Sequence, residues 1–260
     1  MLLVEPNRTP WDLNFSILGF PVRVHPLFWL MCLLMGRDYD AKGILIVTAV
    51  FFVSILVHEL GHALMIRRFG REAHVVLYMM GGLAIEGSGN PYASSYNPRG
   101  ERRTAQEQIY ISLAGPAAGF ILAALAVIFA KGIGGEVVQT WYYKIIPTFD
   151  IRVGPQISPQ LAMVLDILLY VNIFWGVVNL LPVYPLDGGQ VAMQLCMLQD
   201  PYGGLVRGLQ LSIGAGIVAV IFFLAVMGQG GLFPAMLFGS LTVSNYMALQ
   251  QIQGGGGGYR

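Results

Sequence analysis

The chain has 260 residues, of which 55% are hydrophobic and 11% are charged, and its formal net charge is +1. Soluble domains carry about 25% charged residues, so this composition indicates an integral membrane protein and excludes an ordinary soluble domain. The small net charge provides no basic field, and we expect no nucleic-acid partner. The two cysteines, Cys32 and Cys196, offer neither a disulfide framework nor a C-x-x-C metal pair.

The N-terminal region combines a strand pattern with a short apolar run. Residues 1–12 lack a basic segment followed by an apolar one, so no cleaved signal peptide is expected. Residues 15–24 have the composition of a strand. The apolar run at 26–36 is short for a membrane span unless it starts earlier or tilts. We therefore expect an N-terminal strand and first span at 15–36.

The next apolar stretch, 43–69, is long enough to cross a bilayer and contains His58-Glu59-Leu-Gly-His62. On a helix, the pattern H-E-x-x-H places two imidazoles on one face. This spacing suits two ligands of one zinc ion, and the glutamate between them can act as a general base. The alternative is a pair of core histidines joined by hydrogen bonds. Because ionisable groups are costly in hydrocarbon, the pattern favours metal-dependent hydrolysis within a membrane.

Residues 73–86 are too short for a helical span. Their β-branched start and the central Gly81-Gly82 predict two strands joined by a turn or bulge. The following segment, 87–104, is polar and rich in Gly, Ser, Asn and Pro. We expect it to be a mobile loop.

The remainder of the chain is mostly apolar. We predict a loop at 131–160, with Trp141-Tyr142-Tyr143 as an anchor at the membrane interface. The other predicted spans are 105–130, 161–181, 208–227 and 232–249.

These elements predict an all-α polytopic membrane protein with about six transmembrane helices and a small membrane-associated β-hairpin or sheet. One intramembrane domain for metal-dependent hydrolysis would cover residues 1–250. Its catalytic core would lie at about 43–190 and its accessory spans at 208–249. The Gly-rich tail at 251–260 is expected to be flexible.

The basic residues predict the orientation of these spans. Six spans place both termini on the same side, and basic residues concentrate on the cytosolic side of a membrane protein. With the N-terminus inside, the inner basic residues are Arg8, Arg23, Arg67, Arg68, Arg71, Arg99, Arg102, Arg103, Arg207 and Arg260, against the outer set Arg37, Lys42, Lys131, Lys144 and Arg152. We therefore expect both termini and the metal site on the cytosolic side of the cell membrane.

A zinc hydrolase needs three protein ligands and an open position for water, so one ligand is missing. The candidates near membrane depth are His25, His74, Glu86, Asp166 and Asp187. Asp187 alone combines depth, the same side as His62 and a Pro-rich approach. It could equally be the aspartate of a plain Asp-Gly turn, and its position does not decide between the two. We expect His25 and His74 not to be ligands.

Two motifs together resemble those of the site-2 protease family of intramembrane zinc metalloproteases. The first is His58-Glu-Leu-Gly-His62, and the second is Asn179-Leu-Leu-Pro182-Val-Tyr-Pro185-Leu-Asp187-Gly188. A weaker likeness covers 114–119, where the family often has Asn and this chain has Gly119. The strand leading into the first span is also similar, so that the likeness extends over roughly 15–190.

The resemblance implies that Asp187 is the third ligand of one Zn²⁺ and that Glu59 is the catalytic acid and base. Asn179 could donate to the developing oxyanion or hold the substrate backbone, and an interhelical hydrogen bond or helix cap is the open alternative. The two prolines would stop the preceding helix, and Gly188-Gly189 would permit a close turn.

The predicted function is zinc-dependent hydrolysis of peptide bonds in or near transmembrane segments of membrane-bound precursors. The bilayer and a transmembrane protein substrate are the expected partners, and a regulatory membrane partner could add selectivity. An edge around 75–85 could bind the substrate as an extended strand. The alternatives are an inactive metal-binding scaffold, a metal transporter, or a metalloprotease with a glutamate third ligand, for which Glu101, Glu107 and Glu136 are poorly placed.

Overall fold

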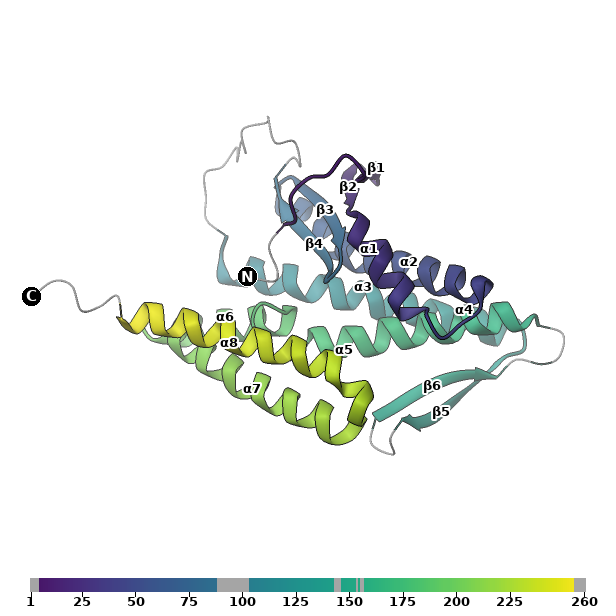
Figure 1. Cartoon of the computed structure of the whole chain (residues 1–260). Coiled ribbons are helices and arrows are strands. Elements are labelled where there is room, and N and C mark those ends of the chain that lie inside the picture. Colours follow the sequence, from purple (N-terminus) through teal and green to yellow (C-terminus); the bar gives the residue numbers. More distant parts are fainter. Residues whose placement is uncertain (1–4, 88–102, 143–145, 153, 155–156, 255–260) are drawn as a thin grey trace, which may run out of the picture. The chain divides into compact units, whose positions relative to one another are not determined.

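The structure of the chain is a computed structural model that describes residues 5–87, 103–142, 146–152, 154 and 157–254 (Figure 1). Its contacts divide the chain into two compact units. The N-terminal unit contains Val4–Arg102 and Ala114–Val177. The C-terminal unit contains Arg103–Leu113 and Val178–Arg260, together with the first three residues. Two helices, Ala105–Gly132 and Gly176–Asn179, have residues in both units.

A four-stranded sheet begins the N-terminal unit, in the order β1-β2-β3-β4. β1 and β2 pair antiparallel, β2 and β3 pair parallel, and β3 and β4 form an antiparallel hairpin in which Tyr78 pairs with Gly81. The two strands predicted within 73–86 are confirmed, and the predicted N-terminal strand is a hairpin. The bounds are β1 Leu13–Ile17, β2 Phe20–Val24, β3 Ala73–Tyr78 and β4 Gly81–Glu86.

The segment before β1 is tied to the sheet by the buried side chain of Arg23. The guanidinium of Arg23 lies 2.9 Å from a carboxylate oxygen of Asp12 and 2.7 Å from one of Glu5. Burial acts to raise the pKa of Asp12. Hydrogen bonds from Thr9 and Arg23, with the charge of Arg23, outweigh that effect and leave the pKa of Asp12 below its usual value.

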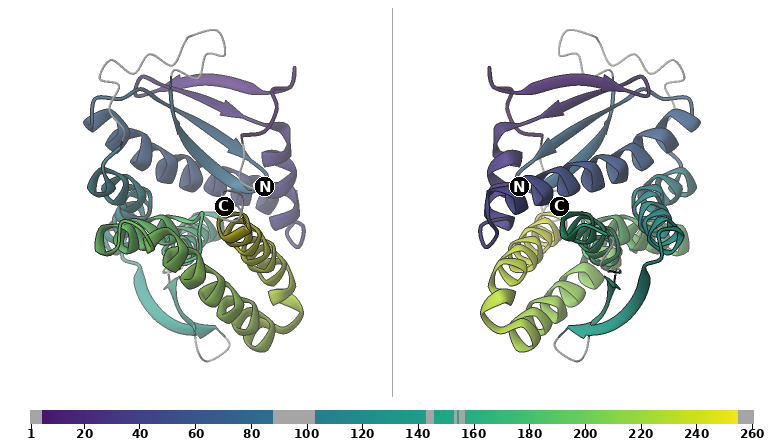
Figure 2. Two further views of the ribbon diagram at one scale, coloured as in Figure 1. Left: turned by 90° about the vertical axis from the view of Figure 1, so that its left-hand side faces the viewer. Right: turned by 90° about the vertical axis from the view of Figure 1, so that its right-hand side faces the viewer.

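Helix α2, Ala41–Arg68, is the central element of the N-terminal unit. Asp40 caps its N-terminus, because the carboxylate of Asp40 accepts a hydrogen bond from the backbone amide of Gly43 at 2.8 Å. β3 and β4 pack along α2, as Figure 2 shows. The shorter helix α1, Pro26–Met35, also packs against α2. This packing brings the β3–β4 hairpin against the helix that carries the H-E-x-x-H sequence.

Residues 131–160 of the N-terminal unit contain a β-hairpin, so the prediction of a loop in this segment is wrong. The aromatic cluster was interpreted as an interfacial anchor, although Val137, Val138 and Thr140 also favour a strand. Buried residues of α3, β6 and α4 form one apolar core here. Asp166 accepts a 2.6 Å hydrogen bond from the Ile151 amide and so joins α4 to β6. The bounds are α3 Ala105–Gly132, β5 Glu136–Tyr142, β6 Ile146–Arg152, α4 Pro159–Tyr170 and the π-helical turn η1 Val171–Trp175.

The C-terminal unit is helical. Helices α7 and α8 pack against each other, and α6 packs against α7. α6 was missed in the sequence, because its glycine-rich start was interpreted only as a turn. The bounds are α5 Gly176–Asn179, which begins in the N-terminal unit, α6 Asp187–Gln199, α7 Gly204–Met227, the 3-10 turn η2 Gly228–Gly231 and α8 Leu232–Gly254.

Helices of membrane-crossing length confirm a polytopic membrane protein. Within the described ranges, five helices are long and apolar enough to span a bilayer: Ala41–Arg68, Ala105–Gly132, Pro159–Asn179, Gly204–Met227 and Leu232–Gln253. The first expected span is only the ten-residue α1, about 15 Å long against a hydrocarbon core of about 30 Å. The mobile loop predicted at 87–104 lies mostly outside the described residues, which omit 88–102. The tail predicted to be flexible from residue 251 begins later, because residues 251–254 belong to helix α8, and 255–260 lie outside the described residues.

Candidate zinc site

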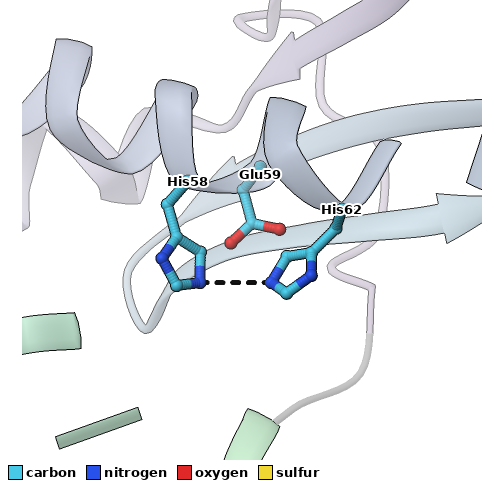
Figure 3. Close-up of side chains that lie close together, drawn as sticks. All are labelled: His58, Glu59 and His62. Atoms are coloured by element: carbon cyan, nitrogen blue, oxygen red, sulfur yellow. Dashed lines mark hydrogen bonds between the residues drawn. The ribbon is translucent and has the colours of Figure 1, made fainter. Parts of the chain in front are cut away.

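His58, Glu59 and His62 lie together on α2 with their side chains on the same side of the helix (Figure 3). The three residues are buried, with exposed fractions of 7%, 6% and 8%. Their possible ligand atoms all lie within 4.8 Å of one another. Among the residues that the structure describes, this is the one group of three His, Cys, Asp or Glu side chains close enough to share a metal ion.

The spacing of the two imidazoles fits one zinc ion. The Nε2 atoms of His58 and His62 are 3.1 Å apart. Two histidine nitrogens, each about 2.0–2.1 Å from a tetrahedral zinc, would lie about 3.3–3.4 Å apart. The rings would therefore need to separate by only a few tenths of an ångström. The donor set of two imidazoles and an adjacent carboxylate is the chemistry that zinc prefers.

The ring of His62 is held against the backbone of α3. A Cβ atom added at Gly115 would collide with the imidazole of His62, including an approach of 2.7 Å to its Cδ2. At the residue before His62, a Cβ at Gly61 would meet the carbonyl oxygen of Ala114 and would lie 2.8 Å from the Cβ of Ala118. The small residues of the 114–119 segment thus allow the close approach of α3 to α2, and Gly115 makes room for a predicted ligand.

The β3–β4 hairpin covers the carboxylate of Glu59. A Cβ atom at Gly82 would lie 2.6 Å from Oε1 and 2.7 Å from Cδ of Glu59, so only glycine leaves this carboxylate its present position. Tyr78 ends β3 close by, with its side chain 6% exposed. Burial and the Glu59 carboxylate raise the pKa of Tyr78, and its hydroxyl has no hydrogen-bond partner among the described residues.

The register of the hairpin determines which groups of β4 face outward. The amide of Gly87 donates to the carbonyl of Glu72 at 2.9 Å. Hydrogen-bonded and non-hydrogen-bonded pairs alternate along an antiparallel ladder, so the backbone groups of Ile85 and Leu83 also form hydrogen bonds with β3. The backbone groups of Gly82 and Ala84 then point to the outer edge. No further strand pairs with that edge in the part of the chain that the structure describes.

Asn172 is a buried polar residue near the predicted ligands that the sequence analysis did not single out. Its side-chain amide donates to Ser54 Oγ at 2.9 Å and to the carbonyl of Leu168 at 2.8 Å. Ser54 lies one helical turn before His58, and Asn172 lies in the π-helical turn η1. A Cβ at Gly119 would lie 3.3 Å from Asn172 Oδ1. An Asn in an otherwise apolar span was the clue that the sequence offered.

Asp187 begins α6 in the C-terminal unit and is buried, with an exposed fraction of 8%. The chain before it folds back tightly, because a Cβ at Gly188 would collide with the backbone of Leu180 and one at Gly189 with that of Val183. The chain does fold back closely here, but the two glycines lie in the first turn of helix α6 rather than in the predicted turn. Asn179 ends α5 and is partly buried. Asp187 and Asn179 belong to the other unit, so their approach to the imidazoles remains a prediction.

The two other candidate histidines make local interactions. His25 caps α1, because its Nδ1 accepts a hydrogen bond from the amide of Leu27 at 3.2 Å. The Nδ1 of His74 lies 3.2 Å from the carbonyl oxygen of Gly87, and its Nε2 lies 3.9 Å from a carboxylate oxygen of Glu5. Glu86 lies 3.4 Å from the guanidinium of Arg71.

A buried H-E-x-x-H pair on a membrane-length helix, beside a small sheet, defines a helical membrane protein with a zinc-peptidase type of metal site. The chain belongs to peptidase family M50, because the family model matches residues 46–223. It resembles the site-2 protease from Methanocaldococcus jannaschii in fold, with a TM-score of 0.53 and 18% identity, over 92% of this chain and 95% of that one.

Two relatives are similar in sequence. Zinc metalloprotease MJ0392 of Methanocaldococcus jannaschii is 23% identical over 220 residues, which are 83% of this chain and 54% of the relative. Putative zinc metalloprotease Rip3 of Mycobacterium tuberculosis is 30% identical over 184 residues, which are 69% of this chain and 38% of the relative. The chain thus spans about half the length, or less, of the curated relatives that it matches.

Proposed function

We propose that the protein is a zinc-dependent endopeptidase that cleaves peptide bonds in or near transmembrane segments of membrane-bound precursor proteins. The observation that carries this proposal is the buried group of His58, Glu59 and His62, with its imidazole nitrogens 3.1 Å apart, on a helix long enough to cross a bilayer. Membership of peptidase family M50 supports the same reaction.

In this proposal, His58, His62 and Asp187 hold the metal ion, and the domain that carries them covers 1–250. The zinc ion, when bound, lowers the pKa of a water molecule and polarises the scissile carbonyl. Glu59 accepts a proton from the attacking water and passes it to the nitrogen of the leaving amine. Asn179 donates a hydrogen bond to the carbonyl oxygen as that oxygen gains negative charge.

The substrate has to be extended before its peptide bond can react, because the hydrogen bonds of a helix shield each carbonyl. The outer edge of β4 offers backbone groups at Gly82 and Ala84 to an extended segment. Gly82 also lies against Glu59, so an added strand on this edge would pass beside the catalytic carboxylate. We infer that β4, rather than the whole 75–85 hairpin, provides the substrate edge.

This inference is tested at Ala84. Ala84→Pro removes the outward amide and should lower turnover at least tenfold while zinc content stays the same. Ala84→Val keeps the amide and suits a strand, so it serves as the matched control. Equal turnover of the two variants would exclude substrate binding by the outer edge of β4.

The orientation of the site also belongs to the proposal. The distribution of basic residues supports a cytosolic position for both termini and for the metal site. Placing both termini on one side requires the region of α1 to complete a crossing. Labelling of single cysteines at 37 and 207 from each side of sealed vesicles checks the prediction, because only residue 207 should react from the cytosolic side.

The experiment that tests the function compares zinc content and cleavage of a membrane-anchored substrate among the wild type, Asp187→Ala and Glu59→Ala. Asp187→Ala should lose both zinc and cleavage. Glu59→Ala should keep zinc and lose cleavage, because it removes only the proton carrier. Cleavage by the Glu59 variant would exclude the mechanism, and a wild type that binds zinc without cleaving would support the scaffold alternative.

A further inference from the structure

The segment that leads to Asp187 has no regular structure, and side chains supplement the few backbone hydrogen bonds that it makes. It lies between α5 and α6, at residues 180–186. Within a membrane, such a segment has to have its backbone groups satisfied by the protein. The carbonyl of Pro185 accepts from Gln190 Nε2 at 3.2 Å, and Gln190 Oε1 accepts from Gln108 Nε2 at 2.6 Å.

Tyr184 lies in the middle of this segment, and both of its backbone groups are held by buried side chains of other helices. Its amide donates to Ser212 Oγ on α7 at 3.1 Å. Its carbonyl accepts from Asn245 Nδ2 on α8 at 2.7 Å, and the same Nδ2 donates to the carbonyl of Leu241 at 2.9 Å. Ser212 and Asn245 are only 1% and 3% exposed. We refer to Ser212 and Asn245 as the α7–α8 clamp.

We propose that the α7–α8 clamp positions the third zinc ligand: by fixing the backbone of Tyr184, Ser212 and Asn245 determine where the carboxylate of Asp187 lies. Asp187 follows Tyr184 by three residues, and the start of α6 packs directly on Tyr184, because a Cβ atom at Gly189 would collide with the amide nitrogen of Tyr184 and the backbone of Val183. A displacement of Tyr184 is therefore transmitted to Asp187. The inference rests on the proposed role of Asp187 as a ligand.

The clamp gives α7 and α8 a part in the metal site that an accessory pair of spans would not have. Buried polar residues on membrane helices are costly unless they have a hydrogen-bond partner. Here Ser212 binds the backbone amide of Tyr184 and Asn245 binds its carbonyl. Groups that orient a metal ligand typically contribute 10- to 100-fold to metal affinity. The clamp should therefore be visible in zinc binding itself, apart from cleavage.

The test measures the zinc Kd of the full chain in detergent by competition with a chelator. Asn245→Ala should raise the Kd about 10- to 100-fold, and Ser212→Ala, the second variant, should raise it in the same direction. Ser244→Ala is the matched control, because Ser244 is the exposed neighbour of Asn245 and bonds only within α8, to Ser240. It should change the Kd less than twofold.

A double-mutant cycle tests whether the clamp acts through Asp187. In an Asp187→Ala background, Asn245→Ala should have no further effect on the Kd. If Asn245→Ala weakens zinc binding in the Asp187→Ala background as much as it does in the wild type, the inference is overturned. It is also overturned if both single clamp variants bind zinc with wild-type affinity while Asp187→Ala weakens binding. Unfolding of both zinc-free clamp variants would also overturn it, because the pair would then serve the fold alone. An unchanged Kd in Asp187→Ala itself would reject the ligand assignment, and the clamp with it.

Discussion

Gly115 should be indispensable for zinc binding although it carries no ligand atom. A Cβ atom at this position would approach His62 Cδ2 to 2.7 Å and two other ring atoms more closely still. Carbon atoms in contact prefer about 3.5–4.0 Å, so the ring has to move by about 1 Å or more. Zinc–ligand distances tolerate only about 0.2 Å. Gly115→Ala should therefore remove His62 from the metal.

The size of the effect follows from the loss of one ligand. Zinc sites with four protein ligands bind with about 10–16 kcal/mol, or about 3 kcal/mol for each ligand. A loss of about 3 kcal/mol corresponds to more than a 100-fold rise in Kd, since about 1.4 kcal/mol is tenfold. Chelator competition on the purified protein measures this change.

Two controls separate the contact with His62 from strain in the helix. Residue 115 precedes Pro116, and a Cβ before proline disfavours the helical backbone. Gly115→Ala should therefore be compared with Gly115→Ala/Pro116→Ala and with Pro116→Ala alone. Gly119→Ala is the second control, since its Cβ would approach Asn172 Oδ1 only to 3.3 Å. Zinc affinity of the double variant equal to that of Pro116→Ala would refute the reasoning.

Three further predictions concern stability. Tyr78→Phe removes a buried hydroxyl without a partner among the described residues, so it should raise the free energy of unfolding by about 1 kcal/mol in chemical denaturation. Asp12 has a lowered pKa, so its stabilising contact with Arg23 is present above about pH 4 and is lost as the pH falls through the pKa of the folded state. The wild type should therefore have a higher Tm than Asp12→Asn above about pH 4, and this difference should disappear at lower pH. A difference in Tm that persists at low pH would contradict the stabilising role of the Asp12 carboxylate. Asn172→Ala removes the hydrogen bond that the buried hydroxyl of Ser54 accepts, and it should lower the free energy of unfolding by about 1–3 kcal/mol. An unchanged free energy of unfolding would contradict this prediction.

The sequence predicts well those features that depend on neighbouring residues. His58 and His62 are one turn apart on any helix, so their meeting required only the correct assignment of α2. The β3–β4 hairpin was evident from β-branched residues before Gly81-Gly82. By contrast, β5 and β6 were missed because Trp141 and its aromatic neighbours also fit an interfacial anchor. A pattern that suits two structures cannot choose between them.

Contacts between distant segments were beyond the sequence. The sequence shows that Gly115 lies in a segment of small residues at 114–119, but only the structure shows that His62 fills the space beside it. Ser212 and Asn245 are single polar residues in apolar spans, and nothing in their neighbourhood indicates that both bind Tyr184. Such pairings depend on how helices pack, which periodicity within one helix does not determine.

The central claim is that one zinc ion joins ligands from both units of the chain. An experimental structure of the zinc-loaded protein, with anomalous diffraction at the zinc edge, tests it most directly. We predict a single zinc peak bonded to Nε2 of His58 and of His62 at about 2.0–2.1 Å and to a carboxylate oxygen of Asp187 at about 2.0–2.2 Å. Zinc bound by the two imidazoles with Asp187 outside bonding distance, or bound elsewhere, would contradict the account.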